Sequence, residues 1–470
     1  MRGHLLRLVA VLALVPRAGA AQAPDSLALE AFLADVARHH PVARQARLSA
    51  DQAGAKQAGA VGALFDPKLG VSWARKAFAG SEYYNYLDAE LKLPTPLGVD
   101  LFLGYERTRG RYFAQDRLTP DNGLLSLGVS LPLGQGLITD RRRAMAAEAR
   151  GLRRAAEAKR DGIINKLLGE AAGAWAAWRA AEAKLALARQ GVDLAVFRAG
   201  AVRQRVAAGD APPIDTVEVD LEVARRRTSL AYATAERVAA RERMGTLWWG
   251  DDGRPRDIAP ALAPGDAGPL APPAPSVLAD WTATALRGHP DIVDAVARRD
   301  AATAVERQAV AELLPDVEAK VARLADGSTD LGDFPDAGGA YKFELTAATS
   351  LLLTKERAEA SIAGARRTIA GLDVVDAERM VAAEIATAAA ALTAATEARV
   401  QQALAVAYAE RLREGEVTRF EAGDASLFLV NQRERTLLDE AAKLADAEAK
   451  AVSARAKLAV ALGWPGQLPE

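Results

Sequence analysis

The side chains that most often perform enzymatic chemistry are scarce or unsuitably spaced in this 470-residue chain. It contains no cysteine, which excludes disulfides, thiolate metal ligands and cysteine nucleophiles. Its four histidines, at positions 4, 39, 40 and 289, do not form an HExxH spacing. Carboxylates are plentiful, but no phosphate-binding loop or nucleophile elbow accompanies them. The sequence therefore predicts that the protein is not an enzyme and has no cofactor or metal site.

One polar tetrapeptide recurs instead. Ala-Gly-Asp-Ala stands at 208–211 and again at 422–425, each time inside alanine-rich, helix-prone sequence. Glycine suits the left-handed residue that ends many helices, and aspartate suits the cap of a following helix. The pattern predicts two helical hairpins that turn at Gly209, Asp210 and Ala211 and at Gly423, Asp424, Ala425 and Ser426. Favourable turn chemistry by itself explains these residues equally well.

A long helix is expected directly before the first turn. The proline-free stretch 139–208 would be about 105 Å long at 1.5 Å per residue, far longer than a globular helix. Apolar residues in it recur in alternating steps of three and four, which is typical of a coiled-coil seam. These residues are Ile164, Leu168, Ala171, Trp175, Trp178, Ala181 and Leu185. The last helix has a similar seam at Leu437, Ala441, Leu444, Ala447, Ala451, Ala454, Leu458 and Ala461.

Strand-like alternation occurs in only two regions, 68–133 and 316–353. The first contains four candidate strands, at 68–76, 83–93, 99–109 and 124–133. The second contains two, at 316–324 and 341–353. So little sheet would leave unpaired edges in one chain. It could close if several chains contributed strands to one barrel, which also satisfies every backbone group in a bilayer.

These elements follow each other twice in the same order, which predicts a duplication. Repeat 1 covers 21–250 and repeat 2 covers 276–470, each with a helix, strands, a long helix, a turn and a final helix. A linker rich in proline and glycine, 251–275, separates them. Residues 1–20 have the basic start, short apolar run and small-residue site of a secretory signal peptide. Without cysteine, the exported chain cannot be lipidated on that residue.

The composition excludes two broad classes of protein. At 50% hydrophobic and 26% charged residues, the chain is unlike a disordered protein. Its net charge of −1 produces no overall positive field that would attract nucleic acid.

Together, the signal peptide, the duplication and the strands between long helices resemble the TolC-like outer-membrane efflux protein family. The resemblance is carried by "HPVARQARLSADQAGAKQAG", "LGVSLPLGQGLITDRRRAMAAEA" and the two segments around the Ala-Gly-Asp-Ala turns, and covers nearly the whole mature chain. It implies an α+β, mainly α fold. By this resemblance, three chains would share a twelve-stranded barrel in the outer membrane, four strands from each, and the barrel would continue into a coiled-coil helical tunnel across the periplasm.

The resemblance also implies the function and the partners. A homotrimer embedded in outer-membrane lipid of a Gram-negative bacterium would be the exit channel of a tripartite efflux or type I secretion system. A periplasmic adaptor and an inner-membrane transporter would dock at its periplasmic tip, where the two turns would lie. A periplasmic coiled-coil scaffold without a membrane barrel is the alternative, but it leaves the strands unexplained.

The resemblance finally implies a gate just beyond the tip turns, where acidic residues in that family favour cations. The corresponding residues here are Asp215 and Glu218 in repeat 1, and Leu429 and Gln432 in repeat 2. Acids near a helix N-terminus are also expected on a plain solvated face. A second departure is the number of candidate strands in the first half, which is four where the family pattern needs two. Either the strands are longer than these segments or an extra hairpin exists, and the pattern does not place the additional strand-like segment at 83–109.

Overall fold

The computed structural model describes residues 26–259, 261–268, 270–329 and 339–464, so the predicted signal peptide lies outside the described part. The chain divides into two compact units built from separate stretches. Unit 1 comprises 1–35, 171–270 and 398–452, and unit 2 comprises 36–170, 271–397 and 453–470. Each unit draws on both predicted repeats, and the repeat boundaries stay a prediction.

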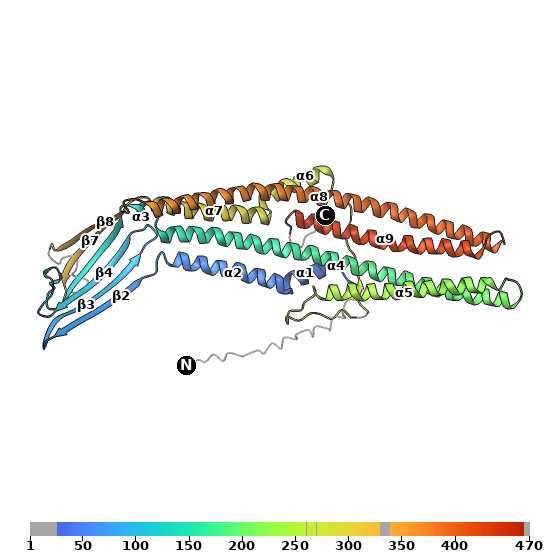
Figure 1. Cartoon of the computed structure of the whole chain (residues 1–470), viewed down its shortest axis with the longest axis horizontal. Helices are drawn as coiled ribbons and strands as arrows, with labels where there is room; N and C mark the ends of the chain where they lie inside the picture. The colour runs from blue at the N-terminus through green and yellow to red at the C-terminus, as the bar shows by residue number, and fades with distance from the viewer. Residues whose placement is uncertain (1–25, 260, 269, 330–338, 465–470) are drawn as a thin grey trace, which may run out of the picture. The chain divides into compact units, whose positions relative to one another are not determined.

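Unit 2 contains the main sheet, which has six antiparallel strands (Figure 1). The first half of the chain supplies β2 (Lys68–Phe78), β3 (Ser81–Pro94), β4 (Asp100–Arg109) and β5 (Leu124–Pro132). The second half supplies β7 (Asp316–Asp326) and β8 (Tyr341–Ala348). They are hydrogen-bonded in the order β2-β3-β4-β5-β7-β8, so the pairing of β5 with β7 joins the two halves of the chain.

All six candidate strands form and share one sheet, two more than the four per chain that the resemblance implies for the barrel. The segment within 83–109 that exceeded the family pattern supplies most of β3 and all of β4, in the middle of the sheet. The last strand is shorter than expected. β8 ends at Ala348, and Leu353 has a φ of 50°, an uncommon left-handed conformation for leucine, immediately before the next helix.

Helices of unit 2 precede each group of strands. α2 (Pro41–Gly62) comes before β2, whereas α6 (Pro275–Gly288) and α7 (Pro290–Ala311) come before β7. The short α3 (Gln135–Ile138) follows β5. The core of the unit is small and aliphatic. Its members include five residues that are at most 5% exposed: Ile292, Val381, Ile385, Leu392 and Leu458.

Two helices are much longer than the rest: α4 (Arg141–Ala207) with 67 residues and α8 (Thr354–Glu421) with 68. All seven residues of the seam predicted in α4 are buried, and Ala171, Trp175 and Trp178 are fully buried. In α9 (Leu427–Ala461), the last four predicted seam residues, from Ala451 onward, are buried, and the first four are half-buried. Small alanine side chains let the helix axes approach closely, which explains a packed seam with few large residues.

Unit 1 packs around two tryptophans of α4. Trp175 donates its indole N–H to the Leu27 carbonyl in β1 (Ser26–Leu27) at 3.1 Å. Trp178 donates to Glu182 at 3.0 Å. Their roles are structural, as expected from their place in the seam. The unit also contains most of α1 (Leu29–His39), all of α5 (Ile214–Gly245) and β6 (Ala263–Pro264), which pairs with β1.

The predicted linker has no helix in its described residues before α6, as its prolines and glycines require. Among the described helices, none combines the length and apolar character needed to cross a bilayer.

Candidate functional site

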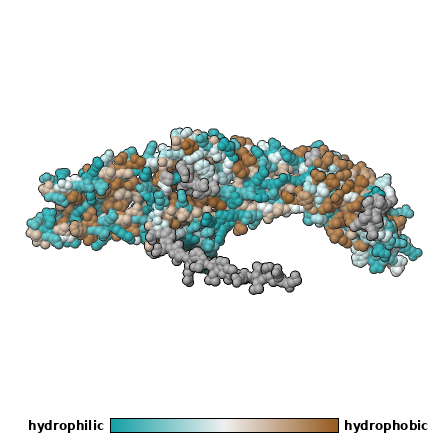
Figure 2. Space-filling model, turned by 180° about the vertical axis from the view of Figure 1, so that it is seen from behind, coloured by the Kyte–Doolittle hydropathy of each residue, from teal (hydrophilic) through white to brown (hydrophobic). Residues whose placement is uncertain are grey.

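One face of the main sheet is apolar although it is exposed. Directly opposed residues of antiparallel strands point to the same face, and the register aligns leucines across four strands. Leu69 lies opposite Leu91, Leu91 opposite Leu103, and Leu103 opposite Leu127. A second row contains Leu93, Leu101, Val129, Val321 and Phe343. Figure 2 shows apolar side chains gathered over these strands.

The extent of this exposure is unusual for large apolar side chains. Leu69, Val71 and Trp73 on β2 are 71%, 63% and 67% exposed, and Phe343 on β8 is 59% exposed. Within one described chain, nothing covers this surface. We call it the apolar sheet face.

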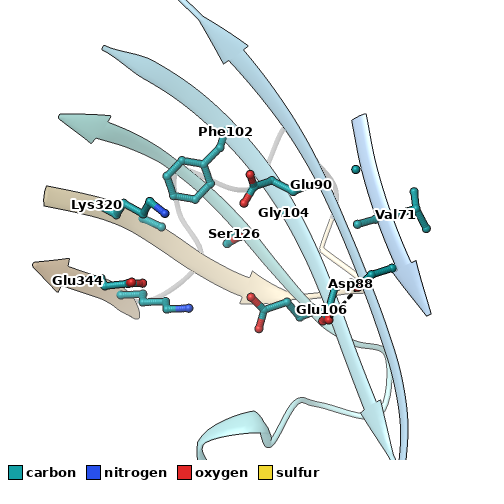
Figure 3. Close-up of a pocket in the computed structure, with 14 residues that line it drawn as sticks. Val71, Asp88, Glu90, Phe102, Gly104, Glu106, Ser126, Lys320 and Glu344 are labelled. Atoms are coloured by element: carbon teal, nitrogen blue, oxygen red, sulfur yellow. Dashed lines mark hydrogen bonds between the residues drawn. The ribbon is translucent and has the colours of Figure 1, made fainter. Parts of the chain in front are cut away.

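The opposite face, called the polar sheet face, carries charge. On this face, Glu90 lies opposite Gly104, which lies opposite Ser126, and Asp88 lies opposite Glu106. Farther across, Lys320 lies opposite Glu344 on β8. Figure 3 shows labelled side chains of this face around a pocket, and Ser72 donates its hydroxyl to Asp88 there at 3.3 Å. The two signs of charge are mixed, so this face is well suited to contact water.

The sheet is fastened to the start of α4 by ion pairs. Asp140 caps this helix, its carboxylate accepting from the Arg143 backbone N–H at 2.7 Å. Arg142 donates to Asp100 at the start of β4 at 2.8 Å, and Lys92 approaches the other oxygen of Asp100 at 3.0 Å. The basic sequence after the last strand of the first half is thus a structural clamp rather than a run of solvated charge.

The two Ala-Gly-Asp-Ala segments form nearly identical turns in unit 1. Gly209 and Gly423 have φ of 83° and 85°, as predicted. The Asp210 N–H donates to the Arg205 carbonyl at 2.9 Å, and the Asp424 N–H donates to the Arg419 carbonyl at 2.8 Å. Bonds that reach back five residues past a left-handed glycine are typical of the Schellman motif at a helix end.

The predicted capping by the aspartates is wrong. α5 starts at Ile214 after Pro213, without a side-chain cap. At α9 the hydroxyl of Ser426 accepts from the Leu429 N–H at 3.4 Å, so serine takes the capping position. Asp210 and Asp424 are exposed, because each turn continues for several residues before the next helix begins.

The residues aligned with a gate differ between the two hairpins. On α5, Asp215 and Glu218 are half-buried, and Glu218 accepts a hydrogen bond from Asn431 of α9 at 3.4 Å. On α9, Leu429 is half-buried and Gln432 is exposed. The carboxylates thus occur in one hairpin only.

A buried polar network, which sequence reasoning missed, connects the two hairpins. Arg198 of α4 makes a two-pronged ion pair with Glu434 of α9, one prong at 2.6 Å, and donates to Asn431 at 2.8 Å. Arg435 of α9 donates to Glu222 of α5 at 2.8 Å. The carboxylates of Glu434 and Glu222 are buried, and each faces an arginine, as burial of charge requires.

One sequence signal could have indicated this network. The polar stretch "NQRER" (431–435) comes directly before the apolar seam of the last helix. A small apolar cluster of Ala199, Val202, Val219 and Leu427 lies in the same unit and contains residues of α4, α5 and α9.

Two histidines cap equivalent helices. The Nδ1 atom of His40 accepts from the Val42 N–H, and that of His289 accepts from the Asp291 N–H, both at 3.2 Å. Burial lowers the pKa of His289 below its usual value, because burial penalises the charged ring. The described residues contain no group of carboxylates and histidines that could hold a metal ion.

Comparison with known proteins agrees with this geometry. Residues 281–464 match the family model described as "Outer membrane efflux protein". A membrane protein from Pseudomonas aeruginosa has a similar structure, with a TM-score of 0.65, 19% identity and coverage of 93% of this chain and 91% of that chain. The outer membrane protein VceC from Vibrio cholerae gives a TM-score of 0.63, 18% identity and coverage of 93% and 97%. No curated protein sequence matches the chain.

The resemblance to TolC-like outer-membrane efflux proteins is confirmed. A third solved structure, the open state of the MtrE outer membrane channel from Neisseria gonorrhoeae, has a TM-score of 0.63 and 16% identity. It covers 93% of this chain and 89% of that chain. At such identities the solved structures establish the fold, which is that of an outer-membrane channel. The family is one of transport proteins rather than enzymes.

Proposed function

We propose that this chain is the outer-membrane exit channel of an efflux or type I secretion system, conducting substrates passively across the periplasm and the outer membrane. The observation that carries the proposal is the two-faced sheet. A soluble protein seldom exposes a continuous apolar surface of this kind. A barrel wall needs an apolar face for lipid and a polar face for the lumen, with every backbone group paired between strands.

The working form in this proposal is a homotrimer. Five strands of its main sheet have 9 to 14 residues, which is long enough to cross a bilayer at a tilt, and β8 has 8. Helices of 67 and 68 residues would each extend about 100 Å, which suits a tunnel through the periplasm. The signal peptide predicted at 1–20 would direct export to the outer membrane of a Gram-negative cell.

The periplasmic adaptor and the inner-membrane transporter would engage the tip turns. In both turns the glycine and the aspartate are exposed and the alanine that follows is half-exposed. A left-handed glycine with no atom within 4 Å of its missing side chain presents open backbone to a partner. The proposed docking residues are Gly209, Asp210, Ala211, Gly423, Asp424, Ala425 and Ser426.

The gate would be formed by the residues that follow these turns. In a trimer, Asp215 and Glu218 would each occur three times, and the resulting carboxylate ring would favour cations over anions. Leu429 and Gln432 would add a neutral part to the constriction.

Cell fractionation tests the proposal directly. The full chain is expressed in a Gram-negative host, inner and outer membranes are separated, and the unheated detergent extract is sized. A heat-sensitive trimer in the outer-membrane fraction is the expected result. A soluble periplasmic species would instead support the scaffold alternative, in which the strands never enter a membrane.

A further inference from the structure

We infer that β3 and β4 form a complete membrane-spanning hairpin, so that the closed barrel contains eighteen strands rather than the twelve implied by the resemblance. The inference rests on the proposed function for the membrane location and for the three copies. Each copy contributes the six strands of its main sheet, and three copies of six strands make eighteen.

The first argument is the position of the hairpin. β3 pairs with β2 from Lys68 opposite Lys92 to Phe78 opposite Ser81. β4 pairs with β5 from Asp100 opposite Ser130 to Glu106 opposite Leu124. The hairpin therefore lies between β2 and β5 and makes ladder hydrogen bonds on both sides. In this sheet β2 has its one paired edge on β3, and β5 has one of its two paired edges on β4, so the hairpin completes the backbone pairing that a bilayer requires.

The second argument is the alternation of side chains. On the apolar sheet face, Leu91 and Leu103 of the hairpin continue the row between Leu69 and Leu127. On the polar sheet face, Glu90 lies between Gly70 and Gly104. The hairpin thus has the same lipid-facing and lumen-facing pattern as its neighbours. A loop folded over the barrel would have no reason to keep this register.

The third argument is the turn between the two strands, which is fixed beside α4 rather than free. Gly98 has a φ of 82°, and its N–H donates to the Thr95 carbonyl at 3.1 Å. A Cβ atom added at Gly98 would lie 3.0 Å from a guanidinium nitrogen of Arg143, so Arg143 packs closely against this turn. Arg142 pairs with Asp100 at 2.8 Å, at the start of β4. The hairpin therefore reaches the end of the sheet where α4 begins.

The occupant of the two sheet edges is a second copy of this chain. Every neighbouring pair from β2 to β8 is antiparallel, so the outermost strands run in opposite directions. In the described part of the chain, no other strand pairs with the outer edge of either one. β8 of one copy can then pair with β2 of the next and continue the antiparallel order until the ring closes.

Strand number determines the width of a barrel. Barrel diameter grows roughly linearly with the number of strands, and barrels of about 16 to 18 strands leave an aqueous channel. The polar sheet face, with Asp88, Glu90, Glu106 and Lys320, would line this lumen with mixed charge. The membrane section would therefore pass larger hydrated solutes than a twelve-stranded barrel.

Single-particle electron microscopy of the full-length protein in lipid nanodiscs counts the strands directly. Eighteen strands in the ring is the expected result. A closed ring of twelve strands, with residues 81–109 outside it, would overturn the inference and leave the channel function intact.

Spin labels give a second readout, because the chain has no native cysteine. Single cysteines replace Leu91, Leu103, Glu90 or Glu106 in the hairpin, and matched controls replace Leu127, Val321, Ser126 or Lys320 in β5 and β7. In phospholipid vesicles, labels at the leucine and valine positions should collide mainly with oxygen, and the others mainly with a water-soluble nickel chelate. If only β5 and β7 alternate, the hairpin is not in the wall. If all eight labels collide mainly with the nickel chelate, the proposed function itself fails.

Discussion

The two halves of the chain build the same series of elements and then diverge in what they add. Each has a histidine cap, a 22-residue helix, strands, a helix of 67 or 68 residues, a Schellman turn and a shorter helix. The first half adds a strand hairpin and two carboxylates beyond its turn, and the second half has neither. The shared elements follow the local sequence closely, and the two halves differ in the number of strands and in the residues that would face lipid, lumen or partner.

The network that connects the hairpins should carry the largest single effect. Replacing Arg198 with methionine leaves Glu434, with 9% of its side chain exposed, buried without its cation. We expect a loss of stability of about 3 kcal/mol, since breaking a buried ion pair leaves the remaining charge buried without a partner. Denaturant unfolding of the full-length protein, followed by tryptophan fluorescence, measures it.

The control for this substitution lies five residues along the same helix. Arg203 pairs with Asp220, and both side chains are at least half exposed. Arg203→Met should change stability by less than about 1 kcal/mol, as exposed pairs do. Equal losses from the two substitutions would mean that the network does not stabilise the packing of the hairpins.

The two turns should respond equally to loss of their glycines. Gly209→Ala and Gly423→Ala each place a side chain at a φ above 80° and should cost about 1 to 2 kcal/mol. Gly200→Ala, inside α4 with open space around it, should instead stabilise the chain by up to about 1 kcal/mol. Thermal unfolding of the three variants compares them, and a different cost at the two turns would break their equivalence.

The proposed gate, unlike the turns, should respond differently to changes in the two halves. The paired change Asp215→Asn and Glu218→Gln removes the carboxylates and should lower cation preference in single-channel recordings. The change Leu429→Asp and Gln432→Glu adds carboxylates to the other hairpin and should raise it. Unchanged selectivity in both variants would contradict the gate assignment without affecting the channel assignment.

The smallest expected effect concerns pH. The pKa of His289 is lowered in the folded state, so folding favours the neutral ring that caps α7. Its contribution to stability is complete above the unfolded pKa, near 6.5, and is lost as pH falls from there through the folded pKa. Comparing unfolding midpoints at pH 7.5 and 5 should show this loss.

Asparagine supplies the control for this titration. His289→Asn keeps a side-chain oxygen that can cap the helix but cannot titrate in this range. The variant should lose less stability between the two pH values than the natural chain. An identical pH dependence in both proteins would assign the loss to other groups.

Much of the architecture could be predicted from local patterns. Strand-like segments in the sequence indicated all six strands of the main sheet, and in three of them the alternating apolar residues were mostly leucines, because side chains of a strand alternate between two faces. Steps of three and four indicated the seam through Trp175 and Trp178, because such residues share one side of a helix. Gly209 and Gly423 indicated the turns, because glycine tolerates left-handed backbone. The family resemblance then led to an outer-membrane channel.

Other features depended on which residues meet across long separations in sequence. Local patterns could not show that β5 pairs with β7, that six strands share one sheet, or that Arg142 clamps Asp100. They also assigned the caps to Asp210 and Asp424, although the turns extend farther and Ser426 caps α9. The partners of Arg198 lie more than 230 residues away on α9. Such contacts depend on how the helices and strands pack together, and a periodic pattern records only which face of an element is buried, not which residue it meets.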